Sequence, residues 1–240
     1  SLNRALAAEI NYREHAEEVF LAEKRVLDYM AHGLALEQIL DAINDVIPTA
    51  IPGGIGSVVL LDTDGQTMRS AAAKHLPAAF NVLVDGMQIG PTIGSCGAAI
   101  YSGQQVIVSD LPNHPNWIPF AELIAPFGLG ACWSTPIRDR QDRVLGSFAI
   151  YFKTKREPTP QEYEYLNRLS HLAGIAVESW NTRNALVISE HKFRNLYNDN
   201  PAMFFTLSEQ GVVLSVNEFG ARHLGWEPEE LLGVHYSELM

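Results

Sequence analysis

Apolar positions at helical spacing mark the first part of the chain. Residues 2–32 contain neither Gly nor Pro, and Val19, Ala22, Val26 and Tyr29 step by three and four along one face. This spacing predicts one long helix, whose stripe either lies on the surface of a domain or forms the seam of a parallel coiled coil. A second helix follows, with its apolar stripe at Leu36, Ile39, Leu40, Ile43, Val46 and Ile47.

The middle of the chain changes to short runs that are typical of β-strands, while residues 76–93 are expected to form a loop. Strands are predicted over residues 57–61, 67–74, 106–108, 131–137 and 144–152. Alternation along the fourth run places Trp133 on one face and Cys132 and Ser134 on the other. The pattern therefore predicts an α+β fold in which a sheet is flanked by helices.

A long helix is predicted to begin at a capping box. Thr159 caps it, Pro160 takes the first helical position and Glu162 reaches back to the cap, so that the helix runs to about Asn198. A coiled-coil seam is predicted at Leu166, Leu169, Ala173, Ala176 and Trp180. A second stripe at Leu172 and Ile175 would pack on the sheet, which favours a parallel homodimer over a plain core helix.

Composition narrows the class of partner. The chain has 17 Lys and Arg against 28 Asp and Glu, and a net charge of −11 disfavours nucleic acid or an anionic membrane surface. Two cysteines do not make a disulfide scaffold, so reduced thiols in a cytoplasmic setting are expected. We also expect no membrane-spanning segment and no signal peptide, and the pattern suggests a piece of a longer protein.

Most residues with chemistry to offer lie between positions 90 and 137. Cys96 is predicted at a helix start, where backbone N–H groups would lower its thiol pKa, or it is a small residue chosen for packing. Cys132 is expected to be a buried structural thiol. Candidate ligand-binding residues are Cys96, Asp110, His114, Trp117, Phe127, Trp133 and Phe148, with Ser134 and Ser147 as further polar groups. By the alternation above, Trp133 and Ser134 cannot both line one pocket.

The ordered series GSCG, VIVSD, ACWSTPI and VLGSFA resembles GAF domains of bacterial sensor histidine kinases and diguanylate cyclases or phosphodiesterases. From residue 190 the chain resembles the first half of a PAS domain, through the runs at 193–196, 224–226 and 230–233. The expected organisation is an N-terminal signalling helix at 1–33, a GAF domain at 34–180, a linker helix at 181–198 and part of a PAS domain at 199–240.

The resemblance implies a GAF-like antiparallel sheet between long signalling helices, in a cytoplasmic sensory module. Such a module binds a small ligand, dimerises, and relays to an output domain outside this chain, either a histidine kinase or a cyclic-di-GMP enzyme. No catalytic residue is assigned within these 240 positions. Two alternatives stay open: a thiol-based small-molecule reductase that uses Cys96, and a spacer that binds nothing and only dimerises.

The resemblance to GAF domains raises the question whether this chain binds a bilin, a haem or a metal ion. A covalent bilin needs Cys followed by His, but Gly97 follows Cys96 and Trp133 follows Cys132, so none is expected. Haem would need an axial His from His75 or His114, each isolated in a polar loop, so haem is not expected either. Asp110 with His114 gives only two ligands and no metal site. The cofactor is left unknown, and the cysteines do not match the pattern of free methionine sulfoxide reductases.

Overall fold

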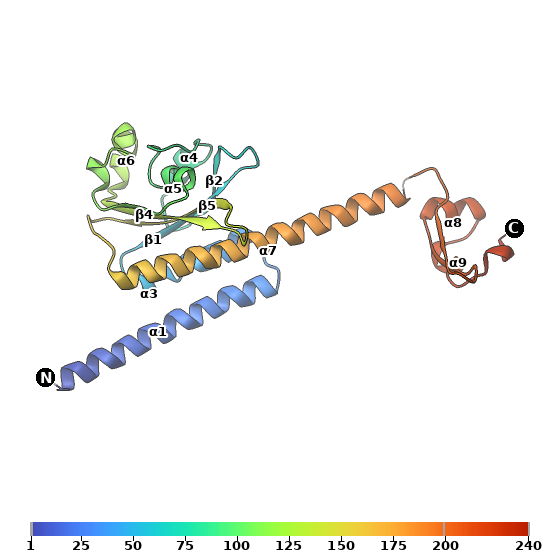
Figure 1. Ribbon diagram of the computed structural model, residues 1–240, viewed down its shortest axis with the longest axis horizontal. Helices are drawn as coiled ribbons and strands as arrows, with labels where there is room; N and C mark the ends of the chain where they lie inside the picture. Colours follow the sequence, from blue (N-terminus) through green and yellow to red (C-terminus); the bar gives the residue numbers. More distant parts are fainter. Residues whose placement is uncertain (1, 199, 240) are drawn as a thin grey trace. The chain divides into compact units, whose positions relative to one another are not determined.

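The computed structural model describes residues 2–198 and 200–239, and it leaves out the side chains of residues 2–15 and 18. The chain forms two compact units, residues 1–180 and residues 181–240 (Figure 1). The prediction of an α+β fold with a GAF-like antiparallel sheet is confirmed. No helix in the described part of the chain is long and apolar enough to cross a membrane.

The first unit is built on a five-stranded antiparallel sheet in the order β2-β1-β5-β4-β3. Its strands are β1 (Ile55–Leu61), β2 (Met68–Ala72), β3 (Val106–Val108), β4 (Ala131–Arg138) and β5 (Val144–Phe152). Its helices are α1 (Leu2–Ala31), α2 (Leu36–Asn44), α3 (Ile47–Ala50), α4 (Ala78–Val84), α5 (Cys96–Ser102), α6 (Ala121–Ile124) and the first part of α7 (Pro160–Asn198). Figure 1 shows α4, α5 and α6 on one face of the sheet and α1 and α7 on the other.

Each face of the sheet has its own core, because side chains alternate along the strands. Trp133, Phe148 and Phe152 belong to the core that α1, α2, α3 and α7 cover. Cys132 and Tyr151 belong to the core under α4, α5 and the 110–130 segment. The predicted alternation of Trp133 against Cys132 is therefore confirmed, and it decides which residues can reach a site on either face.

Helix α7 begins at the predicted capping box. The backbone N–H of Thr159 donates to a Glu162 carboxylate oxygen over 2.9 Å, and the Glu162 N–H donates to the Thr159 hydroxyl over 3.3 Å. Arg156 forms an ion pair with Glu162 and lies over the Phe152 ring, 4.6 Å from its centroid. These contacts join the end of β5 to the start of α7, so the helix starts at a fixed place on the sheet.

The predicted coiled-coil seam of α7 is wrong at four of its five positions. The residues Leu166, Leu169, Ala173 and Ala176 are buried in the core of their own chain, against the sheet and α1. Trp180 is more than a third exposed, and Leu172 and Ile175, which were expected to reach the sheet, are only half-buried. The periodicity of α7 indicated two apolar stripes. The more regular stripe packs on the sheet, because its small residues Ala173 and Ala176 allow the close contact.

Helix α1 lies on the same core. Val19, Ala22 and Val26 are buried, whereas Tyr29 is exposed, and Glu23 forms an ion pair with Arg168 of α7 at 2.5 Å. The sequence left open whether this helix lies on a domain surface or forms a coiled-coil seam, and the structure shows it packed on its own domain.

The loop expected over residues 76–93 contains α4, and residues 118–127 form three short helical turns. Those turns are η2 (Ile118–Phe120), α6 and η3 (Ala125–Phe127). Pro119 and Pro126 each sit at the start of a new turn, which explains the breaks because Pro lacks the N–H that would continue a helix. Both segments cover the second core, so the differences bear directly on the candidate site.

The second unit contains a two-stranded antiparallel sheet of β6 (Phe205–Leu207) and β7 (Val213–Val216). Helices α8 (Glu218–Leu224) and α9 (Pro228–Leu231) and the turn η4 (Tyr236–Glu238) follow. Asn217 caps α8 by accepting from Gly220 N, and its amide donates to the carbonyl oxygens of Tyr197 and Ala202. The end of α7 and the small sheet therefore belong to one folded unit.

We predict that replacing Gly174 of α7 by Ala destabilises the first unit. A Cβ at Gly174 would lie 2.3 Å from the carbonyl oxygen of Arg138, at the end of β4. Helix propensity alone favours Ala by up to about 1 kcal/mol, but overpacking costs about 1–3 kcal/mol. The free energy of unfolding measured with urea should fall by roughly 1–2 kcal/mol, a change opposite in sign to the effect of helix propensity.

The matched control is His171→Ala, an exposed position on the same helix, which should stay within about 0.5 kcal/mol of wild type. A Gly174→Ala protein as stable as wild type would show that α7 does not touch β4 as closely as described.

Candidate functional site

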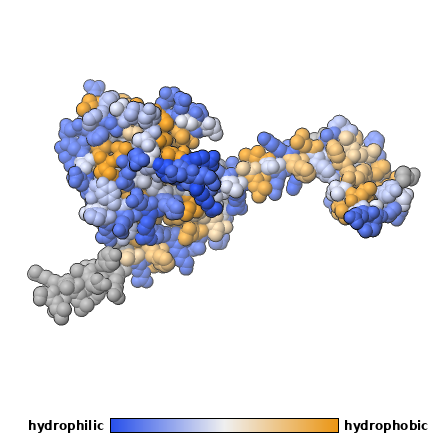
Figure 2. Space-filling view, in the orientation of Figure 1, coloured by the Kyte–Doolittle hydropathy of each residue, from blue (hydrophilic) through white to orange (hydrophobic). Residues whose placement is uncertain are grey.

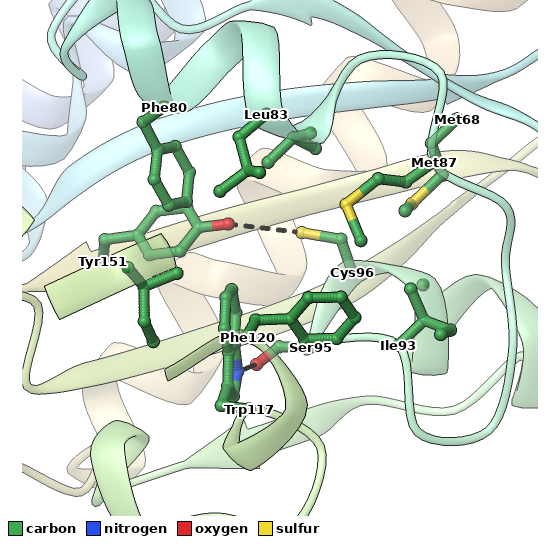
Figure 3. Close-up of a pocket in the computed structure, with 14 residues that line it drawn as sticks. Met68, Phe80, Leu83, Met87, Ile93, Ser95, Cys96, Trp117, Phe120 and Tyr151 are labelled. Carbon is green, nitrogen blue, oxygen red and sulfur yellow. Dashed lines mark hydrogen bonds between the residues drawn. The ribbon is translucent and has the colours of Figure 1, made fainter. Parts of the chain in front are cut away.

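A small cavity lies inside the second core, between the sheet and the segments that carry α4, α5 and α6. Its free volume is about 30 Å³. The sheet contributes Met68 from β2 and Tyr151 from β5, α5 contributes Cys96, and α4 contributes Phe80 and Leu83. The rest of the wall is Val84, Met87, Ile93, Gly94, Ser95, Gly97, Trp117, Phe120 and Ile124. Figure 3 shows these side chains converging on one space from both sides of Cys96.

Aromatic rings set the shape of the cavity. Phe80 meets Tyr151 edge to face with 5.2 Å between ring centroids, and Trp117 meets Phe120 in the same manner at 6.5 Å. The Trp117 indole N–H donates to the Ser95 hydroxyl over 2.8 Å, the dashed line near the foot of Figure 3. This bond fixes the Trp117 ring against the start of α5, where Gly94 adopts a φ of 54° and lacks a Cβ that would crowd the ring.

Both cysteines lie in this core and share one hydroxyl. Cys96 Sγ is 3.5 Å from Ser134 Oγ and 3.6 Å from Tyr151 Oη, and Cys132 Sγ is 3.6 Å from the same Ser134 Oγ. The two strands and the helix that carry them meet here because β4 and β5 pair directly, with Ser134 opposite Ala149, and α5 packs on both strands. The result is a buried set of weakly hydrogen-bonded thiol and hydroxyl groups behind the cavity.

Burial keeps these groups neutral. Desolvation raises the pKa of the Cys96 thiol, and hydrogen bonds from Ser134 and Tyr151 offset it only in part. Desolvation likewise raises the pKa of Cys132 to about 12, and that of Tyr151 well above its usual value. The expected lowering of the Cys96 pKa by the helix start is therefore wrong, because removal from water outweighs the helix N–H groups.

Among the residues that the structure describes, none that lines the cavity carries a formal charge at neutral pH. Its polar groups are the Cys96 thiol, the Tyr151 hydroxyl and the Ser95 hydroxyl. An ion without a compensating charge is strongly disfavoured in such surroundings. The cavity therefore disfavours any guest that carries a net charge.

Two of the seven predicted ligand-binding residues, Cys96 and Trp117, line the cavity. Phe127 lies one layer behind, edge to face with Phe80 at 5.2 Å. The prediction that Trp133 and Phe148 bind the ligand is wrong, because both point to the opposite face of the sheet and are buried in the core that α7 covers.

Asp110 and His114 are also outside the cavity. Asp110 accepts from Lys155 at 2.6 Å and from Asn113, and the Lys155 ammonium with the Asn113 amide lowers its carboxyl pKa. His114 accepts from the backbone N–H of Asn116 at its Nδ1, and so fixes the turn before Trp117. Within the described residues, no group of three or more His, Cys, Asp or Glu side chains is placed to hold a metal ion.

The sequence interpretation missed most of the wall, including Phe80, Met68, Met87 and Tyr151. Tyr151 could have been found, because alternation along β5 puts it opposite Phe148 and therefore on the Cys132 side. Phe80 and Met87 had no such signal, since they lie in the segment that was expected to be a loop. Only the tertiary packing of α4 brings them to the sheet.

Residues 34–178 match the GAF domain family, and residues 191–240 match the PAS fold. The chain belongs to the GAF domain family. The predicted arrangement of a GAF domain followed by PAS sequence is thereby confirmed.

The GAF domain and its flanks are similar to known proteins in sequence and in structure. The chain is 29% identical over 238 residues to a methyl sulfide methyltransferase-associated sensor from Methanosarcina acetivorans, matching 99% of this chain. The chain spans about a quarter of the length of that curated relative, 24%.

Two solved structures show the same fold. The GAF domain of a phosphoenolpyruvate-protein phosphotransferase from Coxiella burnetii is 17% identical, with a TM-score of 0.56, and covers 71% of this chain and 98% of its own. The free methionine-R-sulfoxide reductase from Neisseria meningitidis is 19% identical, with a TM-score of 0.54, covering 70% of this chain and 91% of its own. At these identities the likeness concerns the fold alone.

We predict that the Cys132 thiol makes the GAF domain lose stability at alkaline pH. The unfolded thiol ionises near its usual pKa of about 8.5, whereas the folded thiol stays protonated until about pH 12. Its contribution is complete below the unfolded pKa and falls by up to about 1.4 kcal/mol per pH unit above it. The free energy of unfolding, measured with urea between pH 9 and 11, should therefore fall less steeply with pH for Cys132→Ala than for wild type.

Cys96 and Tyr151 are present in both proteins, so the difference between the two slopes reports the removal of the Cys132 thiol. Parallel pH profiles for wild type and variant would mean that Cys132 ionises alike in the folded and unfolded states.

Proposed function

We propose that this segment is a cytoplasmic sensory module, in which a small ligand without net charge binds the GAF cavity and α7 relays its presence to an output domain. The observation that carries the proposal is that cavity and relay helix lie on the two faces of the same strands. Tyr151 and Cys132 face the cavity side, while Phe152 and Trp133 face the α7 side.

Size and lining support a small ligand. A cavity of about 30 Å³ holds one or two waters, whereas pockets for drug-sized ligands measure about 300–1,000 Å³. A larger ligand would have to displace α4 or the Trp117 segment. Nucleotides and nitrate fit poorly, because the described lining residues provide no positive charge to meet them.

The relay follows from alternation along β4. Any ligand that moves Cys132 or Ser134 also moves Trp133, because the three share one strand. The Trp133 ring packs on the Phe152 ring with 4.2 Å between their centroids. The Trp133 indole N–H donates to the carbonyl oxygen of Arg156, close in sequence to the α7 cap. Two packings of α7 on the sheet would then correspond to the empty and occupied cavity.

The output and the oligomeric state belong to this proposal as well. The Methanosarcina relative is named a sensor and is about four times as long as the matched segment, which supports an output domain, a histidine kinase or a cyclic-di-GMP enzyme, elsewhere in the same polypeptide. The second copy needed for a parallel homodimer would meet the linker helix rather than the buried seam. There Leu186, Phe193 and Leu196 are 59%, 67% and 73% exposed and follow heptad spacing with Ser189. Figure 2 shows hydrophobic surface along this part of α7.

The thiol reductase alternative has weaker support. One structural relative is a reductase, but a nucleophilic cysteine acts as the thiolate, and burial holds the Cys96 thiol protonated.

We predict that filling the cavity abolishes ligand binding. Leu83→Trp places an indole in the space beside Phe80, whereas Val82→Trp places it on the solvent side of the same helix, where Val82 is 76% exposed. Thermal unfolding with dimethyl sulfide should shift Tm upward by several degrees for wild type and Val82→Trp, since saturating ligand adds about 3 kcal/mol.

Leu83→Trp should show less than half that shift. Equal shifts in both variants, or a response to ATP or nitrate instead, would place the ligand outside this cavity.

We predict that Ser189→Cys forms an inter-chain disulfide, because Ser189 lies on the exposed heptad stripe and a parallel dimer brings equivalent positions together. His191→Cys, on the opposite side of the helix, is the matched control and should stay monomeric on non-reducing gels. Cross-linking at His191 and none at Ser189 would contradict the stripe as the dimer contact.

A further inference from the structure

One hydroxyl in the wall of the GAF cavity has only sulfur to bond with. Tyr151 is 1% exposed, and its Oη lies 3.6 Å from Cys96 Sγ. Within the described residues, the groups that hydrogen-bond to this hydroxyl are the thiols of Cys96 and Cys132. A thiol is a weak hydrogen-bond acceptor, so the Tyr151 O–H lacks the stronger partner that a buried phenol usually finds.

Two other side-chain donors of the wall have oxygen partners. The Trp117 indole N–H donates to Ser95 Oγ over 2.8 Å. The Cys96 thiol lies 3.5 Å from Ser134 Oγ, which can accept a hydrogen bond from it. Burial raises the pKa of Tyr151 well above its usual value, so the phenol keeps its proton at neutral pH. Tyr151 is therefore a donor whose present partner a guest oxygen would improve on.

The Tyr151 hydroxyl is held in a fixed place. Its strand, β5, lies inside the sheet, and Tyr151 pairs with Cys132 of β4. The phenol ring packs edge to face on Phe80. Figure 3 shows the hydroxyl extending toward Cys96 into the space that the labelled side chains surround. A rigid strand thus presents one hydrogen-bond donor to a cavity whose other walls are mostly apolar.

These features favour a guest that accepts a hydrogen bond. An ion is disfavoured, because the described lining residues carry no charge. A guest with its own O–H or N–H would need an acceptor, and Met68, Met87 and Cys96 offer sulfur, which accepts weakly. A carbonyl oxygen accepts without donating, and an O–H···O bond of about 2.7 Å is stronger than a contact to sulfur.

We infer that the GAF cavity binds a small neutral carbonyl compound, a ketone or aldehyde of two or three carbons, whose oxygen accepts from the Tyr151 hydroxyl. The inference rests on the proposed ligand cavity, because it names a ligand class for that same space. Leu83, Met87 and Phe120 are only partly buried, so their side chains can move aside to admit such a guest. Burial raises the pKa of the Cys96 thiol, so its sulfur forms no bond to the guest and binding is non-covalent.

The test is a titration of the whole chain with acetone and with isobutene, which has nearly the same shape but no acceptor oxygen. The methyl NMR signals of Met68 and Met87 report occupancy, because both side chains line the cavity. Tyr151→Phe keeps the ring and removes the hydroxyl. We expect this change to weaken acetone binding about tenfold and to leave isobutene binding within about threefold of wild type.

The matched control is Tyr101→Phe on α5, where the side chain is 59% exposed, and this protein should bind both probes like wild type. An equal loss for both probes in Tyr151→Phe, or no loss for acetone, would overturn the inference. If Tyr151→Phe does not fold, the infrared carbonyl stretch of carbon-13 acetone bound to wild type decides: a hydrogen bond lowers it below the value in hexane, and an unchanged value contradicts the inference.

Failure of this inference can be told apart from failure of the proposed function. If isobutene binds and acetone does not, the carbonyl class is wrong and the proposed sensory cavity stands. If neither probe perturbs the methyl signals and dimethyl sulfide leaves Tm of wild type unchanged, both fail.

Discussion

The contact between Gly174 and the carbonyl oxygen of Arg138 is the constraint on which the arrangement of the GAF domain depends. A helix can lie this close to a strand end only where it has no side chain. Ser170, one turn earlier, donates its hydroxyl to the carbonyl oxygen of Pro136 over 3.0 Å. Two adjacent turns of α7 thus touch the backbone of β4 directly. A shift of that strand cannot be absorbed by side chains between strand and helix, so it has to move the helix.

The two faces of the sheet have different physical characters. Under α7, Trp133, Phe148 and Phe152 fill the space with large rings, and Arg156 closes it over the indole and phenyl faces. On the other face, Met68 and Tyr151 border the cavity of about 30 Å³. A close-packed face transmits displacement well, because its contacts are already at van der Waals distance, while the looser face can accept a guest. Alternate residues of the same strands therefore belong to a filled core on one face and to a core with a small cavity on the other.

Sequence reasoning reached the fold because its signals were local. The capping box at Thr159 and Glu162 and the alternation around Trp133 depend on neighbouring residues and were confirmed. The cavity wall was mostly missed, since Phe80 and Met87 reach it through tertiary packing of a segment without strong periodicity. The seam of α7 failed for a related reason. Leu166 and its partners have a spacing that suits a twin helix or a sheet equally well, and only the small residues around Gly174 indicate which surface comes close.

The surface on which the regular stripe of α7 packs determines where a second copy could bind. If the most regular stripe of α7 packs on its own sheet, a partner helix has to bind elsewhere, and Leu186, Phe193 and Leu196 are among the exposed apolar positions on the linker. The cavity and the dimer contact would then act on successive stretches of one continuous helix. A ligand that changes how Ser170 and Gly174 sit on β4 would alter the rotation or height at which α7 leaves the sheet. In the proposed relay, such a change would reach the linker stripe without any new contact between cavity and partner, because a hydrogen-bonded helix transmits rotation along its length.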